Sequence, residues 1–208
     1  MTPLVKSGCN ALGVLVGAGW YAQSTVHVGD KSVLALLSVT TSDGKTAYFP
    51  SKVSGTTGDL IFDSAASPVS DEDVYIGEKY DARLEQSGWS SCVFKPASPW
   101  NRAVAATHDP VKAGGILNTR TVQILVDRRY SVVNVTQPAG DDYVIDFGQN
   151  IAGLLKMSLV CPVPGTNILI HAGESLHPDG TVLNQYSNSP MITNYTCKGG
   201  SDLEGYTT

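Results

Sequence analysis

"YSVVNVTQPAGDDYVIDFGQN", residues 130 to 150, contains the pattern that decides the fold class. Two runs rich in β-branched and aromatic residues, 130–135 and 142–146, flank the turn-forming triplet Pro138-Ala139-Gly140. Short runs of this kind, joined by Pro and Gly, predict strand, turn and strand. The same pattern recurs along the chain, and we expect further strands at 10–16, 33–40, 45–49, 73–76, 79–84, 101–106, 121–126, 153–160, 167–172 and 191–196.

The chain lacks the signature of helices. No segment carries an apolar stripe of period 3.6 over three turns. Charged residues make up 16% of the 208 residues, against roughly 25% in a typical domain, while Gly (21) and Pro (11) are plentiful. Many short strands at roughly 8–12-residue spacing predict an all-β protein built from antiparallel, jelly-roll-like sandwiches.

A boundary between two modules is predicted near residues 107–115, "THDPVKAGG", which contain a proline and two glycines and show no periodicity. We therefore expect two β-sandwich modules in tandem, residues 1–109 and 110–208. No internal repeat is visible.

The charge and hydropathy of the chain exclude two classes of partner. The net charge is −5, and no basic run exceeds Arg128-Arg129, so nucleic acid is not an expected partner. The chain contains no run of 18 apolar residues, so no membrane-spanning segment is expected. The apolar stretch 11–20 lacks a basic lead-in and contains three glycines, so no signal peptide is predicted and the compartment stays unassigned.

Four scattered cysteines, Cys9, Cys92, Cys161 and Cys197, form no C-x-x-C pair, so a zinc site is not expected. One or two disulfides and isolated buried thiols remain alternatives. Two N-x-T triplets, 134–136 and 194–196, match the acceptor pattern for N-glycosylation, although such triplets also arise often by chance.

The triplet Asp146-Phe147-Gly148 resembles the metal-binding D-F-G of protein kinases. A kinase also needs a glycine-rich loop, a lysine on a following strand and an H-R-D segment, and the chain contains neither a G-x-G-x-x-G opening nor an H-R-D. A P-loop and a G-x-S-x-G nucleophile elbow are missing too. We interpret the triplet as a strand end followed by a turn.

Two clusters of polar residues offer chemistry, and each has a structural alternative. "HAGESLHPDG", residues 171–180, holds two histidines and two acids that could ligate a metal, but the favoured interpretation is a strand end and a Pro-Asp-Gly turn. Glu78 and Asp81 are a possible catalytic pair. On a strand they point to opposite faces, so they could not share one substrate. Asp81 and Arg83 lie on one face and are expected to pair.

Four stretches in this order resemble the non-catalytic β-sandwich region of bacterial-type α-L-rhamnosidases, glycoside hydrolase family 78. They are "NALGVLVGAGWY" (10–21), "DVYIGEKYDARLEQSGW" (73–89), "YVIDFGQNIAGLLKMSLVCPVPGTNILIHAGESLHPDGTV" (143–182) and "NYTCKGG" (194–200). The resemblance covers nearly the whole chain. The chain departs from the family pattern between Gly44 and Asp73 and at "HAGES". These departures concern the details of the expected loops.

The resemblance implies a parent enzyme that hydrolyses terminal α-L-rhamnose with inversion, using carboxylates of an (α/α)₆ barrel. No such barrel is visible in this chain, so it is expected to have no catalytic residues and to support the missing catalytic domain of the parent. The chain also looks truncated within its first sandwich and stops before a segment that completes the second.

The alternative function is a stand-alone carbohydrate-binding module or lectin for rhamnose-containing glycans. Some relatives carry a Ca²⁺-dependent rhamnose-binding module, so Ca²⁺ is a possible addition at a sugar site, and no other cofactor is expected. Aromatic rings near strand ends can stack on a sugar ring or cap the core. The candidate sugar-contacting residues are Asn10, Trp20, Tyr21 and Trp89. A third alternative is a structural β protein that self-associates through unpaired strand edges.

Overall fold

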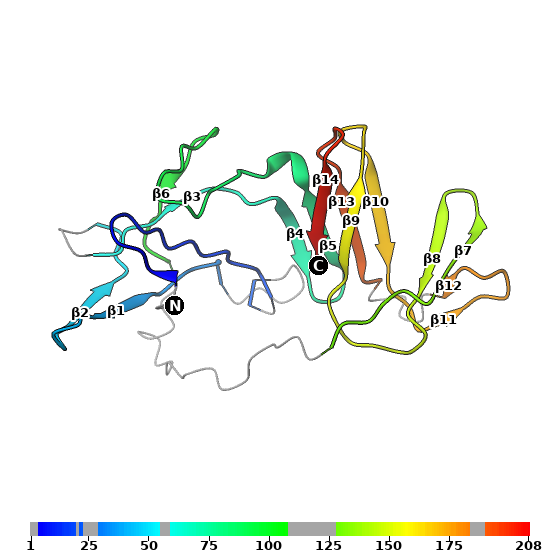
Figure 1. The fold of residues 1–208 in the computed structure, drawn as a ribbon, viewed down its shortest axis with the longest axis horizontal. Coiled ribbons are helices and arrows are strands. Elements are labelled where there is room, and N and C mark those ends of the chain that lie inside the picture. The colour runs from blue at the N-terminus through cyan, green and yellow to red at the C-terminus, as the bar shows by residue number, and fades with distance from the viewer. Residues whose placement is uncertain (1–3, 20, 23–28, 55–58, 108–127, 184–189) are drawn as a thin grey trace. The chain divides into compact units, whose positions relative to one another are not determined.

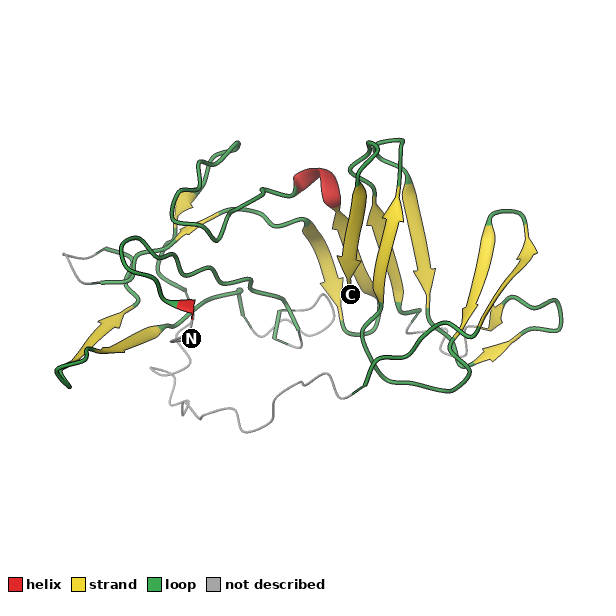
Figure 2. Ribbon diagram, viewed as in Figure 1, coloured by secondary structure: helices red, strands yellow, loops and turns green. Residues whose placement is uncertain are grey.

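The computed structural model describes residues 4–19, 21–22, 29–54, 59–107, 128–183 and 190–208 (Figure 1). Strands, turns and loops make up nearly all of this part, and one of the short helical segments is the 3₁₀ turn η2 (Ala82–Leu84) (Figure 2). The all-β prediction is confirmed. No helix in the described ranges has the length and apolar character to cross a membrane.

The chain divides into two structural units. The first comprises residues 1–70 and 84–109, and the second comprises 71–83 and 110–208. Residues 71–83 therefore group with the second unit, although they precede the boundary expected near residue 109. The assignment of modules to 1–109 and 110–208 stays a prediction.

The first unit contains two antiparallel strand pairs. β1 (Leu36–Thr40) pairs with β2 (Thr46–Pro50), and β3 (Asp63–Ser64) pairs with β6 (Asn101–Arg102). The β1–β2 turn forms because the Asp43 carboxylate accepts hydrogen bonds from Thr41 and Lys45 and Gly44 supplies a φ of 81°.

The second unit contains a four-stranded sheet in the order β10-β13-β5-β4 (Figure 1). β10 pairs antiparallel with β13, whereas β13 and β5 are parallel, with Tyr195 opposite Tyr80. β14 and β9 form a separate antiparallel pair, and β7–β8 and β11–β12 are hairpins. The bounds are β4 Val69–Asp73, β5 Gly77–Asp81, β7 Asn134–Ala139, β8 Asp142–Asp146, β9 Lys156–Val160, β10 Asn167–His171, β11 Ser175–Leu176, β12 Val182–Leu183, β13 Ile192–Thr196 and β14 Leu203–Thr207.

The core of the second unit lies between the four-stranded sheet and the β9–β14 pair, as in a sandwich. Alternation along β13 turns Thr193, Tyr195 and then Cys197 inward, with Tyr195 only 1% exposed. Tyr195 stacks on Tyr80, and both rings contact Tyr206 of β14 at 5.0 Å between centroids. The buried members of the cluster are Ala82, Cys161, Tyr195, Cys197 and Tyr206, with Tyr80, Met157, Leu159, Ile168 and Ile170 packed against them.

Most predicted strands are present with shifted ends. The prediction at 142–146 has the observed bounds, and those at 45–49, 167–172 and 191–196 are within one residue of them. The predictions at 33–40, 130–135 and 153–160 overlap β1, β7 and β9 but begin three or four residues too early.

Two predicted strands are wrong. Residues 10–16 form no strand, because an apolar run becomes a strand when its backbone is hydrogen-bonded to a neighbouring strand, which hydropathy alone does not provide. Of residues 73–76, Asp73 ends β4 and 74–76 form a turn, since the Asp73 carboxylate accepts hydrogen bonds from the backbone N–H groups of Tyr75 (2.8 Å) and Ile76 (3.3 Å). The strand there, β4, lies just before that turn.

Other predictions are partly right or fall outside the structure. Of the prediction at 79–84, only the first part is strand, because η2 follows Asp81. Of 101–106, only β6 is strand. The prediction at 121–126 lies outside the described residues. The sequence pattern missed β14, whose "LEGYT" has a glycine at its centre.

Candidate functional site

Asn10, a candidate sugar ligand, holds its own loop together. Its side-chain amide donates to the carbonyl groups of Lys6 (2.8 Å) and Gly8 (3.1 Å), while its Oδ1 accepts from the Lys6 N–H (2.9 Å). Both ends of the amide therefore stabilise the turn 6–10. The residue is exposed, but the polar groups that would face a sugar are already engaged locally.

Trp89 lies beside that loop. The disulfide Cys9–Cys92 joins residues 83 positions apart, with 5.9 Å between the Cα atoms, and so ties the Asn10 loop to the Trp89 loop. A Cβ at Gly13 would come within 2.5 Å of Trp89 Cζ3, so the indole ring lies directly on the Gly13 backbone. With 39% of its surface exposed, Trp89 leaves part of the ring available to a ligand.

Tyr21 follows a short turn in which Ala18 O accepts from the backbone N–H groups of Tyr21 and Ala22, both at 3.1 Å. Its ring covers Gly29, where a Cβ would be 2.6 Å from the hydroxyl. Trp20, the remaining candidate, lies outside the described residues. The structure thus brings Asn10 and Trp89 to one disulfide-linked pair of loops, while the ring of Tyr21 lies against Gly29.

Trp100 illustrates the alternative, structural use of an indole. Its Nε1 donates to Gln86 Oε1 (3.0 Å), and its ring meets Phe94 edge-on at 5.6 Å between centroids. Gln86 in turn donates to Ser98 (3.1 Å), so Trp100 anchors the loop 86–100.

The acids Glu78 and Asp81 have separate partners. Glu78 accepts a hydrogen bond from the Tyr206 hydroxyl in the second unit. Burial, together with that bond, raises the pKa of Tyr206 above its ordinary value of 10.0. Asp81 holds Arg83 through two bonds of 2.9 and 2.7 Å, which lower the pKa of Asp81. The expected Asp81–Arg83 pair is confirmed, and the carboxylates of Glu78 and Asp81 are hydrogen-bonded to different residues.

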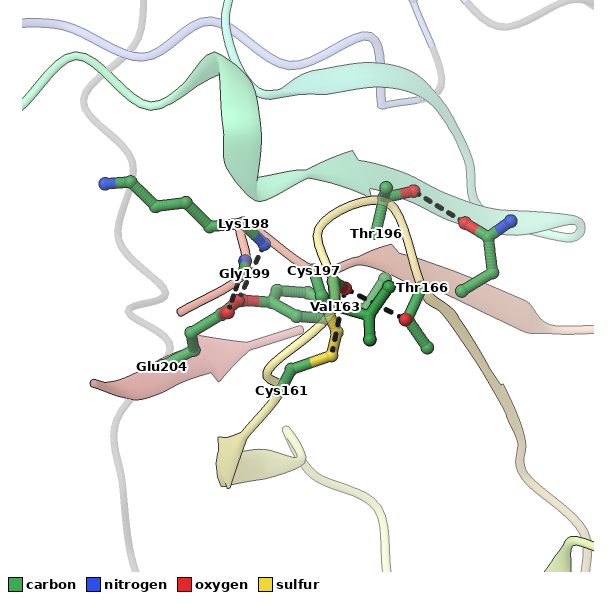
Figure 3. The surroundings of a disulfide bond; sticks show 10 residues. Cys161, Val163, Thr166, Thr196, Cys197, Lys198, Gly199 and Glu204 are labelled. Carbon is green, nitrogen blue, oxygen red and sulfur yellow. Dashed lines mark hydrogen bonds between the residues drawn. A yellow bond between two sulfur atoms is a disulfide. The ribbon is translucent and has the colours of Figure 1, made fainter. Parts of the chain in front are cut away.

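Glu204 accepts hydrogen bonds from three different residues, and the sequence pattern gave no sign of it. It accepts from the Tyr195 hydroxyl (2.7 Å) and from the backbone N–H groups of Lys198 (3.0 Å) and Gly199 (3.0 Å), as Figure 3 shows. Burial acts to raise the pKa of Glu204, but the hydrogen bonds prevail and hold it below its ordinary value of 4.5.

A second disulfide, Cys161–Cys197, lies beside Glu204 (Figure 3). Its Cα atoms are 6.1 Å apart, and Cys197 is fully buried, so the bridge links the end of β9 to the end of β13 within the core. All four cysteines are paired, and the alternative of isolated thiols is wrong.

The histidine-rich segment 171–180 also has a structural role. His171 ends β10, and Asp179 accepts hydrogen bonds from the N–H (2.9 Å) and hydroxyl (2.7 Å) of Thr181, which lower the pKa of Asp179. His177 and Gly180 close the same turn through their backbones. Within the described ranges, no three His, Cys, Asp or Glu side chains group in a way that could hold a metal ion.

The Asp146-Phe147-Gly148 triplet is a turn. The Asp146 carboxylate accepts the Gly148 N–H at 2.7 Å, directly after β8. Phe147 is half-buried.

Comparisons with known proteins agree along most of the chain. Residues 1–125 match the family model for the α-L-rhamnosidase N-terminal domain, and residues 136–207 match that for the bacterial α-L-rhamnosidase concanavalin-like domain. An α-L-rhamnosidase from Streptomyces avermitilis is 30% identical over 206 residues, which cover 96% of this chain and 19% of that protein. One from Formosa agariphila is 28% identical, covering 96% and 21%.

Solved structures give the same result. An α-L-rhamnosidase from Dictyoglumus thermophilum superimposes with a TM-score of 0.70 at 25% identity, covering 83% of this chain and 18% of that one. The Streptomyces avermitilis enzyme complexed with L-rhamnose gives a TM-score of 0.66 at 28% identity, covering 90% and 18%. The chain spans about a fifth of the length of the curated relatives it matches. It carries the N-terminal and concanavalin-like domains of the bacterial α-L-rhamnosidases and belongs to that family.

Proposed function

We propose that this chain is a non-catalytic β-sandwich portion of an α-L-rhamnosidase-like glycoside hydrolase and that it supports the catalytic region of the parent. The observation that carries the proposal is the match of residues 1–125 and 136–207 to two rhamnosidase domain models in a chain about one fifth the length of the relatives it matches.

The use of the acids supports this role. Glycoside hydrolysis needs two carboxylates astride one scissile bond. Here each acid is hydrogen-bonded to a different partner. Glu78 accepts from the Tyr206 hydroxyl, Asp81 accepts from Arg83, and Glu204 accepts from Tyr195 at the β13–β14 connection. Hydrogen-bonded carboxylates with a depressed pKa, such as Asp81 and Glu204, are poor general acids at neutral pH.

An assay of the purified chain on an aryl α-L-rhamnoside tests the proposal. We expect no turnover above buffer from a sample whose far-ultraviolet circular dichroism shows a folded β protein. Turnover that disappears in Glu78→Gln or Asp81→Asn, but persists in the exposed control Glu174→Gln, would overturn it.

A second candidate, sugar binding by the first unit, is favoured by Trp89. Its partly exposed indole lies on Gly13 and is fixed by the neighbouring Cys9–Cys92 bridge, so a stacking surface would be ordered before a sugar arrives. Because one relative was solved with L-rhamnose, that sugar is the natural probe.

Calorimetric titration with L-rhamnose, with and without Ca²⁺, tests this candidate. Binding should be lost in Trp89→Ala and kept in Trp100→Phe, because Trp100 is committed to Gln86 and Phe94. Absence of heat at millimolar sugar counts against it.

Sedimentation of the same sample tests the third alternative, self-association through unpaired strand edges. A purely monomeric boundary would contradict it.

A further inference from the structure

The two N-x-T triplets occupy opposite environments in the second unit. Asn134 is the first residue of β7, and Asn134, Val135 and Thr136 are all exposed, Val135 by 54%. Within the part of the chain that the structure describes, β7 and β8 form a two-stranded hairpin that contributes no residue to the buried cluster (Figure 1). A large group attached to Asn134 would therefore extend into solvent.

The second triplet is built into a sheet. Asn194 lies at the centre of β13, directly opposite Leu169 on one side and Lys79 on the other. Its Oδ1 is buried, and the Thr196 hydroxyl donates to Asn167 Oδ1 at 2.8 Å. Tyr195 between them is 1% exposed. Asn194 thus has a paired strand on each side and a buried side-chain oxygen, whereas Asn134 is exposed and is paired on one side, with Asp146, so Asn194 is much the less accessible acceptor.

The cysteines supply an independent observation about the compartment. All four are paired, and their Cα separations of 5.9 and 6.1 Å lie within the range that a disulfide spans. Disulfides form and persist in oxidising environments such as the lumen of the secretory pathway, and that is where N-x-T asparagines receive glycans.

We propose that Asn134 is an N-glycosylation site of this chain and that Asn194 is not. The donor is an oligosaccharide linked through pyrophosphate to a lipid. The Asn134 Nδ2 forms a bond to the anomeric carbon, the bond from that carbon to the pyrophosphate oxygen breaks, the amide releases one proton, and the lipid pyrophosphate leaves. The product is an N-glycan at the base of the β7–β8 hairpin.

Secretion of the chain from yeast tests the proposal. We expect a single upward shift on a denaturing gel that peptide N-glycosidase removes, leaving Asp in place of Asn134 in the peptide mass spectrum. Thr136→Ser keeps the triplet and should keep the shift, whereas the isosteric Thr136→Val should lose it although Asn134 is unchanged.

Peptide mass spectrometry shows directly which of the two asparagines carries a glycan. The peptide that contains Asn194 should have its unmodified mass in the secreted wild type, so the conclusion does not depend on whether Asn194→Gln folds. An unshifted wild type, a shift that survives Thr136→Val, or a glycan on Asn194 in secreted, disulfide-bonded protein would each overturn the proposal.

Discussion

The Tyr195 hydroxyl donates to Glu204 Oε2 at 2.7 Å, and this bond joins the buried face of β13 to the start of β14. The same carboxylate accepts the backbone N–H groups of Lys198 and Gly199. One side chain therefore fixes the whole connection that follows Cys197, next to the buried disulfide (Figure 3).

Glu204→Gln should destabilise the second unit. The substitution removes the charge from three hydrogen bonds and turns an amide toward N–H donors, so we expect a loss of about 2 kcal/mol in the free energy of unfolding. Urea denaturation followed by circular dichroism measures it. The exposed control Glu174→Gln should stay within about 0.5 kcal/mol of the wild type, and equal stability of the two variants would contradict the role of Glu204.

The contribution of Glu204 to the free energy of unfolding should decrease at low pH. Because the folded-state pKa of Glu204 lies below its ordinary value of 4.5, the stabilisation is fully present above that pH and is lost as the pH falls through the folded pKa. Other acids, including Asp81 and Asp179, shift in the same direction. The gap in unfolding free energy between wild type and Glu204→Gln, measured at neutral pH and in steps below 4.5, should therefore narrow. A constant gap would show that the charge is not responsible.

The two disulfides should differ in accessibility to reductant. Cys9 and Cys92 are exposed, whereas Cys161 is 6% and Cys197 0% exposed, so a mild thiol should open Cys9–Cys92 first. Alkylation of the released thiols followed by peptide mass spectrometry gives the order. Simultaneous labelling of all four cysteines in folded protein would contradict it.

Loss of the buried bridge should be costly. A paired Cys161→Ala, Cys197→Ala variant frees a loop of 36 residues, for which chain entropy predicts a cost of about 4 kcal/mol. Thermal and urea unfolding of this variant and of the matched pair Cys9→Ala, Cys92→Ala give the comparison. Full stability of the first variant would contradict a structural role.

Gly77→Ala should disrupt the sheet of the second unit. Gly77 has a φ of 110°, and a Cβ there would overlap the carbonyl oxygen of Ile192 on β13. We expect a loss of at least about 3 kcal/mol. Gly44→Ala is the matched control, since its φ is 81° with no atom within 4 Å of the added carbon, and backbone strain alone should cost it about 1 kcal/mol. Equal losses would mean that the contact with Ile192 is unimportant.

The sequence predicted the elements whose cause is local. Alternating runs bounded by Pro, Asp and Gly identified β2, β8, β10 and β13, because both the period-two pattern and the turn chemistry lie within a few residues. It failed where two local rules compete. At residues 74–76 an apolar run follows Asp73, whose carboxylate accepts the N–H groups of Tyr75 and Ile76, and the turn prevails.

The candidate site was predicted only in part, because its geometry depends on long-range pairing. The Cys9–Cys92 bridge brings the Asn10 and Trp89 loops together across 83 positions, and spacing alone could not select that pairing. Asn10 was chosen as a polar candidate, but its amide caps a turn, an assignment that requires backbone positions. Glu204 carries no signal at all, since its partners come from the strand before it and the connection after that strand.

The parallel pairing of β5 with β13 constrains how the protein can be made. Tyr80 leaves the ribosome more than a hundred residues before Tyr195, its partner in the sheet, and residues 84–109 of the first unit are synthesised in between. The sheet of the second unit therefore closes only after residue 196 has emerged, and until then β5 lacks its neighbour β13 and Tyr80 lacks its partner Tyr195. The two parts of the second unit are thus separated in the chain by residues 84–109 of the first, and a fragment beginning at residue 110 would lack β4 and β5, two of the four strands of its own sheet.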